Sequence, residues 1–149
     1  MRLLLLNGPN LNLLGEREPE IYGTATLADV ESAVRKSAIP SGAEVVALQS
    51  NSEGALIDAL HAHRHEVDGV IFNPGAYTHY SYALLDAIAA IKPPVVEVHL
   101  SDITKREGFR ATSVVAPACF ATVMGKGIDG YREAVAILVA HLGEEAARG

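Results

Sequence analysis

The sequence has a single cysteine, no tryptophan and no long apolar run, and each absence narrows what the chain can be. Cys119 alone cannot form a disulfide within the chain, which favours a reducing compartment such as the cytoplasm. Because no run of 18 apolar residues occurs, we expect no membrane span. The leucine run after Arg2 is too short for the core of a signal peptide.

Basic residues are also scarce. Lys and Arg total 12 against 18 Asp and Glu, which gives a net charge of −6. Nucleic-acid binding needs a basic stripe, so we expect no nucleic-acid partner, although a local basic pocket for a small anion is compatible with this charge. With 49% hydrophobic and 20% charged residues, we expect residues 1–149 to form one globular, soluble domain.

Short apolar segments alternate with amphipathic ones along the chain, and they predict strands and helices respectively. We expect strands at residues 3–6, 44–48, 67–72 and 95–98, and a short fifth at 114–115. We expect helices at residues 26–39, 82–91 and 131–142, and one after the Ser50–Glu53 pair that has Leu56, Ile57 and Leu60 on one face. Thr26 with Asp29, and Ser50 with Glu53, have the spacing of helix-capping pairs.

This alternation predicts βαβ units with right-handed crossovers, and therefore a parallel sheet. Five strands suit an α/β, flavodoxin-like doubly wound sheet with helices on both faces better than a barrel, which needs eight. By analogy with that fold we expect the strand order 2-1-3-4-5.

Polar side chains follow the carboxyl ends of the expected strands, where ligands bind in open α/β sheets. They are amides, hydroxyls and two imidazoles, namely Asn7, Asn10, Asn12, Gln49, Ser50, Asn51, Asn73, His79, His99 and Ser101. Such a set can hold a polyhydroxylated small molecule, and it lacks the carboxylates that favour a divalent metal. His61, His63 and His65 do not predict a metal site either, because only the first and last share a helix face.

Residues 15–23 form an unusual connection between a strand and a helix, and two interpretations are open. In the first, the segment is a solvated loop in which Tyr22 caps the core and Arg17 pairs with a nearby glutamate. In the second, it is a mobile lid between two glycines that carries a phenol and a guanidinium over the site. A cation within roughly 4–6 Å of a phenol favours the ionised form of its hydroxyl.

Several blocks of sequence, taken together, resemble the type II 3-dehydroquinate dehydratases. They are residues 7–15 (NGPNLNLLG), 17–19 (REP), 22–23 (YG), 49–54 (QSNSEG), 73–79 (NPGAYTH), 96–101 (VEVHLS), 106–107 (RE) and 109–110 (FR). Each block alone is weak, but together, in the order of the family, they are highly specific.

The resemblance implies a hydro-lyase of the shikimate pathway, which leads to the aromatic amino acids. Its reaction, the third step of that pathway, dehydrates 3-dehydroquinate to 3-dehydroshikimate by anti elimination through an enolate. It implies no metal and no organic cofactor. It also implies a homo-oligomer, a dodecamer built from trimers.

Residue roles follow from the resemblance, position by position. Tyr22 would remove the proton alpha to the ketone, and Arg17 would favour its phenolate. Asn10 would help to hold a water at the enolate oxygen. His99, oriented by Glu97, would protonate the departing hydroxyl.

The resemblance also implies the residues that hold the substrate. Asn73 and the segment Leu100–Ser101 would bind its carboxylate, and His79 and Arg110 its ring hydroxyls. Asp86 would reach the site of a neighbouring subunit.

Elementary chemistry is consistent with these roles. Removal of a proton alpha to a ketone needs a positioned base and a stabilised enolate, and loss of hydroxide needs an acid. Histidine changes its charge most readily near neutral pH. Glu97 and His99 are two residues apart on a strand, so their side chains project to the same face.

A different class of function is a non-catalytic flavodoxin-like module that binds flavin or acts as a phospho-receiver. A receiver needs an acidic cluster after its early strands, whereas Asn7 and Asn73 stand at those positions. A flavin carrier would have a Ser/Thr-rich phosphate loop after the first strand, where Pro9 and several leucines follow instead. A Schiff-base lysine is not expected, because no lysine falls within a predicted strand.

Overall fold

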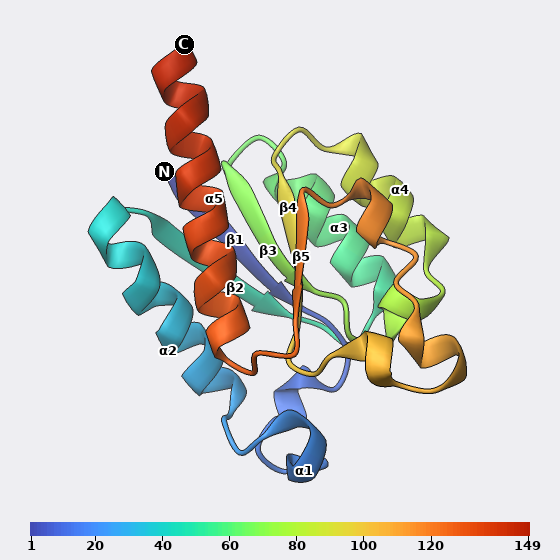
Figure 1. Cartoon of the computed structure of the whole chain (residues 1–149). Helices are drawn as coiled ribbons and strands as arrows, with labels where there is room; N and C mark the ends of the chain where they lie inside the picture. Colours follow the sequence, from blue (N-terminus) through green and yellow to red (C-terminus); the bar gives the residue numbers. More distant parts are fainter.

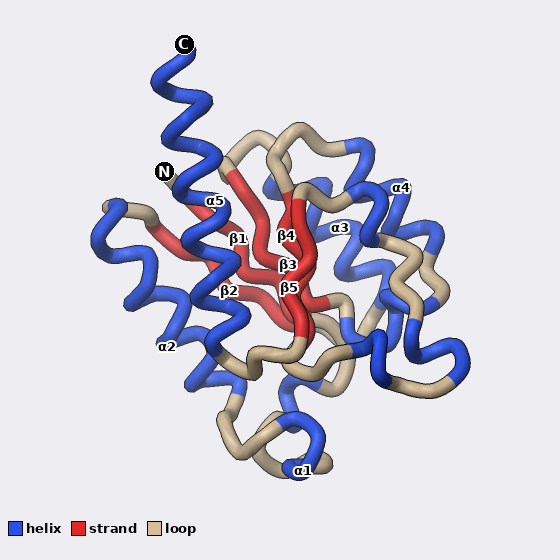
Figure 2. The backbone as a smooth tube through the Cα atoms, viewed as in Figure 1, coloured by secondary structure: helices blue, strands red, loops and turns tan.

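A five-stranded parallel sheet with helices on both faces forms the centre of the molecule (Figures 1 and 2). The structure, a computed structural model, describes residues 1–149. The strands lie in the order β2-β1-β3-β4-β5, with the bounds β1 Arg2–Asn7, β2 Glu44–Gln49, β3 Gly69–Asn73, β4 Val95–His99 and β5 Ala121–Met124. The helices are α1 Pro19–Tyr22, α2 Leu27–Ala38, α3 Glu53–His63, α4 Tyr82–Ala90 and α5 Asp129–Arg148. The flavodoxin-like fold and its strand order, both predicted from the sequence, are confirmed.

The apolar strands bury both of their faces, because helices cover the sheet on each side. Leu3 and Leu5 of β1 pack with α2 and α5 in one core cluster, whereas Leu4 and Leu6 pack with α3 and α4 in the other. All four leucines are at most 1% exposed. This is why a continuous leucine run, instead of an alternating pattern, predicts a central parallel strand.

The carboxyl ends of the three central strands come together at one edge of the sheet. Asn7 pairs in register with Asn73, and the Gly8 amide donates to the Asn73 carbonyl at 2.8 Å. A Cβ at Gly8 would lie 2.6 Å from the carbonyl oxygen of Pro74, so no other residue fits there. Glycine therefore lets the loops after β1 and β3 approach closely, and these loops form one wall of the site described below.

The predicted position of the fifth strand is wrong. Residues 114–115 belong to a loop, in which the Val114 amide donates to the carbonyl of Thr78 at 2.7 Å. The strand at that edge is β5, further along the chain, and only Val123 of its four residues is buried. Val115 is fully buried, but it packs against the α3–α4 cluster from outside the sheet.

Two helix boundaries also differ from the prediction. The N-cap of α3 is Ser52, whose hydroxyl accepts from the Ala55 amide at 3.2 Å, while the Ser50 hydroxyl accepts from the Ser52 amide. Helix α5 starts at Asp129 and continues to Arg148, beyond the predicted end at residue 142. None of the helices combines the length and the apolarity that crossing a membrane would require.

The predicted cap of α2 forms a complete capping box. The Thr26 hydroxyl accepts from the Asp29 amide at 3.2 Å, and the Asp29 carboxylate accepts from the Thr26 amide at 2.9 Å. These hydrogen bonds, the one from the Thr26 backbone first, lower the pKa of the Asp29 carboxyl.

We expect Thr26→Ala to lower the free energy of unfolding by about 1 kcal/mol, because the Asp29 amide at the start of α2 loses its hydrogen-bond acceptor. Urea unfolding followed by circular dichroism measures this. Thr24→Ala is the matched control, since Thr24 is exposed and precedes the cap. Equal unfolding midpoints for the two variants would show that the capping box contributes nothing.

Candidate active site

A cavity opens at the carboxyl edge of the sheet, between the loops that follow β1, β3 and β4. It is lined by Pro9, Asn10, Leu11, Arg17, Tyr22, Asn73, Gly75, Ala76, His79, His99, Leu100, Ser101, Ile103, Arg106 and Arg110. All the site residues predicted from the sequence line this cavity except Glu97, which lies behind His99, and Asp86, which lies on α4. The lining combines three guanidinium groups with neutral amides and hydroxyls, which suits an anionic, hydroxylated ligand.

Residues 15–23 extend from the end of the sheet and include the short helix α1 (Figure 1), and Arg17 and Tyr22 of this segment line the cavity. Both bounding glycines have left-handed backbone angles, with φ of +90° at Gly15 and +80° at Gly23. Of the two interpretations of this segment, the loop interpretation is correct that Tyr22 packs against the core. The ion pair that this interpretation expects between Arg17 and a glutamate is absent. Arg17 stacks on Tyr22 instead, with Cζ 4.9 Å from the ring centre. The mobility of the lid stays a prediction.

Two guanidinium groups surround the Tyr22 side chain. Arg17 covers its ring, and Nη1 of Arg106 lies 3.4 Å from its hydroxyl oxygen. Arg106 comes from the loop after β4, so the two cations reach the tyrosine from different parts of the chain. Positive charge therefore lies on two sides of this side chain.

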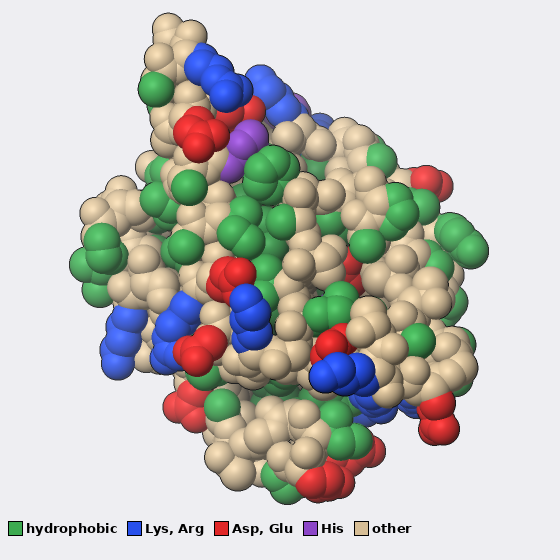
Figure 3. Space-filling model, in the orientation of Figure 1, with side chains coloured by type: hydrophobic (Ala, Val, Ile, Leu, Met, Phe, Trp, Pro, Cys, Tyr) green, Lys and Arg blue, Asp and Glu red, His purple; other side chains and the backbone are tan.

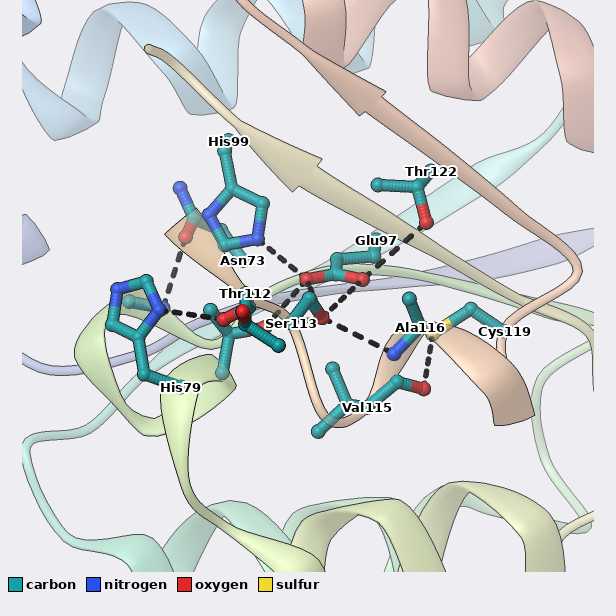
Figure 4. Close-up of polar contacts among 12 residues, drawn as sticks. Asn73, His79, Glu97, His99, Thr112, Ser113, Val115, Ala116, Cys119 and Thr122 are labelled. Atoms are coloured by element: carbon teal, nitrogen blue, oxygen red, sulfur yellow. Dashed lines mark hydrogen bonds and ion pairs between the residues drawn. The ribbon is translucent and has the colours of Figure 1, made fainter. Parts of the chain in front are cut away.

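Behind the cavity, the Glu97 carboxylate holds the imidazole of His99. Their atoms Oε2 and Nε2 are 2.5 Å apart, and Glu97 is fully buried (Figure 4). A carboxylate can only accept, so Nε2 of His99 carries a proton and Nδ1 is the atom free for ligand chemistry. Burial acts to raise the pKa of Glu97, but hydrogen bonds from His99, Thr78 and Ser113 outweigh it, and the pKa lies below its ordinary value.

Asn73 is held in one orientation by two neighbours. Its Oδ1 accepts from the Gly75 amide at 3.0 Å, and its Nδ2 donates to the hydroxyl of Tyr131 at 2.9 Å. That hydroxyl in turn donates to Oδ1 of Asn7 at 2.7 Å. Burial raises the pKa of Tyr131, which therefore stays a phenol. With these contacts fixed, Asn73 has one N–H left to present to the cavity as a donor.

His79 is fixed by a backbone carbonyl. Its Nδ1 lies 2.8 Å from the Thr112 carbonyl oxygen (Figure 4), and its ring contacts Phe109 edge to face. Because a carbonyl only accepts, Nδ1 carries the proton and Nε2 is left as an acceptor. Arg110 lines the same side of the cavity, with its guanidinium over Phe109.

The end of β2 supports the cavity wall without lining it. Asn10 has a left-handed backbone conformation, with φ of +68°, and its amide donates to Oδ1 of Asn51 at 3.0 Å. Gln49 donates to the same oxygen at 3.1 Å. The sequence predicts Gln49 and Asn51 among the side chains at the ligand-binding edge of the sheet. In the structure they instead support the backbone of Asn10.

The remaining predicted features lie outside the cavity. Asp86 is exposed on α4. No group of three or more His, Cys, Asp or Glu side chains is arranged to hold a metal ion, and His61 and His65 are both exposed. On the face drawn in Figure 3, Lys and Arg side chains are interspersed with Asp and Glu.

Sequence reasoning gave no role to four side chains that the structure places at the site. Arg106 falls within a motif block, and its proximity to Tyr22 depends on how the loop after β4 folds. Thr78 lies in the block at 73–79, but nothing in the sequence indicates its contact with Glu97. Ser113 and Tyr131 fall outside every block, so only the tertiary structure identifies them.

Comparison with known proteins gives a consistent result. Residues 1–139 match the sequence profile of the family described as Dehydroquinase class II. The chain is 54% identical over 140 residues to a protein of Bacillus pumilus named 3-dehydroquinate dehydratase, covering 94% of this chain and 95% of that one. It is 55% identical over 139 residues to a protein of the same name from Anoxybacillus flavithermus, covering 93% and 94% of the two chains. The crystal structure of a type II dehydroquinase from Butyrivibrio crossotus superposes with a TM-score of 0.90 at 42% identity, over 93% of this chain and 97% of that chain.

Proposed function

Because the chain belongs to the class II dehydroquinase family, we propose that the cavity at the carboxyl edge of the sheet is the site where it dehydrates 3-dehydroquinate. The chain is a hydro-lyase of the shikimate pathway, and its product is 3-dehydroshikimate. One observation supports the assignment of the site: the same cavity is lined by a tyrosine and by a histidine that a buried carboxylate holds. Two guanidinium groups lie beside the tyrosine. The alternative of a flavin carrier or receiver module is not favoured.

Tyr22 is the base in this proposal. Its phenolate takes the proton on the carbon alpha to the ketone, and the electron pair moves onto the ketone oxygen to give an enolate. Arg17 and Arg106 stabilise the phenolate before the transfer. Asn10, at the rim of the cavity, helps to hold a water that donates to the enolate oxygen.

His99 is the acid of the second step. The enolate collapses to a conjugated enone, the carbon–oxygen bond to the tertiary hydroxyl breaks, and His99 gives that hydroxyl the proton with which it leaves as water. Glu97 stabilises the imidazolium that is needed for this step. Tyr22 and His99 then return to their starting states by exchanging protons with solvent, so one water is released for each substrate consumed.

The other lining residues hold the substrate in this proposal. Asn73 directs its free N–H to the substrate carboxylate, together with the segment Leu100–Ser101. His79 and Arg110 take the ring hydroxyls, because they stand together on the side of the cavity formed after β3 and β4.

We expect the purified chain to convert 3-dehydroquinate to an enone, detected by its rising ultraviolet absorbance, without added metal or organic cofactor. Side chains of the protein itself carry out both proton transfers. Activity should therefore be unchanged after dialysis against a strong chelator. Activity that disappears with the chelator and returns with a divalent metal would contradict the cofactor-free mechanism. Deuterium-labelled substrate would test whether elimination is anti.

The assembly and location of the chain are also proposals. Asp86 is exposed on α4 and does not line the cavity of its own chain, as suits a residue that reaches a neighbouring subunit's site. We propose that residues 1–149 act as one catalytic domain, that the chains assemble as trimers within a dodecamer, and that they work in the cytoplasm. Neither a nucleic acid nor a membrane has a part in this proposal.

A further inference from the structure

The Glu97 carboxylate receives more hydrogen bonds than the His99 contact alone requires. Three hydroxyl groups from three other segments surround it, and Figure 4 labels two of them, Ser113 and Thr122. Thr78 Oγ1 donates to Oε2 at 2.5 Å, Ser113 Oγ lies 2.8 and 3.0 Å from Oε2 and Oε1, and Thr122 Oγ1 lies 3.3 Å from Oε1. We call Thr78, Ser113 and Thr122 the hydroxyl cage.

The cage suits an ionised carboxylate. An ionised carboxylate is only an acceptor, so it can receive all three hydroxyl protons and the N–H of His99 at once. A protonated Glu97 would have to donate a hydrogen bond, and each surrounding group already directs a proton towards it. Burying a carboxylate without such partners is costly, so the cage is what allows Glu97 to be both fully buried and charged.

We propose that Thr78 and Ser113 are positioning residues for the dehydration: their hydroxyls hold Glu97 as an anion in a single orientation, and Glu97 in turn holds His99 with Nδ1 towards the substrate. The proposal rests on the roles given above to Glu97 and His99. Neither hydroxyl touches the substrate. Each acts through the carboxylate.

The position of Ser113 extends this role to the substrate-binding wall. Its hydroxyl is itself fixed, because it accepts from the Ala116 amide at 3.1 Å and lies 2.9 Å from Thr78 Oγ1. Its neighbour Thr112 accepts from His79, and its neighbour Val114 donates to the carbonyl of Thr78. One short segment, residues 112–114, thus aligns the acid of the second step with a residue that binds the ring hydroxyls.

Two titratable groups face Glu97. His99 lies on the same strand, and the thiol of Cys119 approaches from the segment before β5. Burial and the nearby Glu97 charge raise the pKa of Cys119 to about 12, so the thiol stays neutral. The other groups that contact the carboxylate, the three hydroxyls of the cage, do not titrate. A change in the pH profile after removal of a cage hydroxyl therefore reports on the Glu97–His99 pair.

The test uses substitutions that remove or keep a hydroxyl with little change in volume. Thr78→Val and Ser113→Ala each remove one donor, whereas Thr78→Ser keeps it. Ser41→Ala is the matched control, because its half-buried hydroxyl donates to the carbonyl of Ala38, away from the cavity. We expect Thr78→Val and Ser113→Ala to lower kcat about 10-fold or more with KM within about 2-fold, because hydrogen bonds to charged groups are the strong ones. Thr78→Ser and Ser41→Ala should retain most of the kcat.

The pH profile gives the second readout. Hydrogen bonds from Thr78 and Ser113 help to hold the pKa of Glu97 below its ordinary value. Without one of these hydroxyls the carboxylate is less stable, so the pKa of Glu97 rises. Because Glu97 must be ionised to hold His99, the acidic limb of the kcat profile should move to higher pH in Thr78→Val and Ser113→Ala, which a purely structural role would not cause.

Glu97→Gln separates failure of this inference from failure of the proposed function. Full kcat in Glu97→Gln would contradict the role of Glu97, and the inference with it. A low kcat in Glu97→Gln with normal kcat and an unmoved profile in Thr78→Val and Ser113→Ala would overturn the inference alone. If Thr78→Val does not fold, Ser113→Ala alone tests the inference. If Thr78→Ser loses as much kcat as Thr78→Val, the result would contradict a role for the hydroxyl of Thr78. In the Glu97→Gln background, Ser113→Ala should cause no further loss of kcat.

Discussion

Tyr22→Phe is expected to lower kcat for 3-dehydroquinate by at least about 100-fold, the lower end of what a positioned general base contributes. The substitution removes only the hydroxyl, whose oxygen lies 3.4 Å from Nη1 of Arg106. The ring that Arg17 covers and that packs on the core remains. Folding should therefore be nearly unaffected, and steady-state kinetics measures the loss.

Tyr80→Phe is the matched control for this prediction, because Tyr80 is 59% exposed and does not line the cavity. Calorimetry with a substrate mimic should show that Tyr22→Phe still binds. Turnover near the unsubstituted level in Tyr22→Phe would exclude Tyr22 as the base and would leave the two guanidiniums without a chemical task.

His99→Asn is expected to cause a loss of similar size, about 100-fold or more in kcat, because an amide cannot donate a proton to a departing hydroxyl. Asparagine is a neutral polar side chain smaller than histidine, so the substitution removes the proton donor without introducing a charge or a larger group. His61→Asn, at an exposed position on α3, is the control.

The two variants should differ when substrate is incubated in D₂O. His99→Asn retains the base, so the proton alpha to the ketone should exchange with solvent although dehydration is slow. Tyr22→Phe should lose this exchange together with dehydration. NMR of the substrate follows both processes. Exchange by Tyr22→Phe but not by His99→Asn would mean that the roles of base and acid are reversed.

The sequence predicts the central strands well, because each buries both faces and is therefore an apolar run that can be recognised without knowledge of the tertiary structure. The prediction of the fifth strand is wrong because this signal is absent there. At the edge of the sheet β5 buries only Val123 of its four residues, so its sequence lacks such a run. Val114 and Val115 are two apolar residues in succession, but the Val114 amide donates to the carbonyl of Thr78, and both residues lie in a loop.

The capping error at α3 has a local cause. Ser50 and Ser52 both lie close enough to the helix to cap it, and only Ser50 has an acidic residue, Glu53, three positions later, so the sequence pattern favours Ser50. In the structure Ser50 bonds to the Ser52 amide, and Ser52 caps the helix. Thr24 likewise precedes Thr26 by two residues, but there only Thr26 has an acidic residue, Asp29, three positions later, and its predicted cap is correct.

Most candidate site residues could be named from motif blocks, because those blocks follow strand ends that meet at one edge of the sheet. The supporting contacts could not. Arg106 is 84 positions from Tyr22 and Tyr131 is 58 from Asn73, and no local pattern encodes pairs so distant. The residues that line the cavity can be identified from sequence motifs, whereas the residues that hold them in place can be identified only from the tertiary structure.

The contact between Tyr131 and Asn73 has a consequence for biosynthesis of the chain itself. Tyr131 follows every other residue of the cavity in the sequence, and it belongs to the first turns of α5. During translation, the donor amide of Asn73 is therefore without its anchor until this last helix has left the ribosome and docked on the sheet. A nascent chain that has made every lining residue therefore still lacks the hydrogen bond that fixes the Asn73 amide nitrogen until α5 has docked.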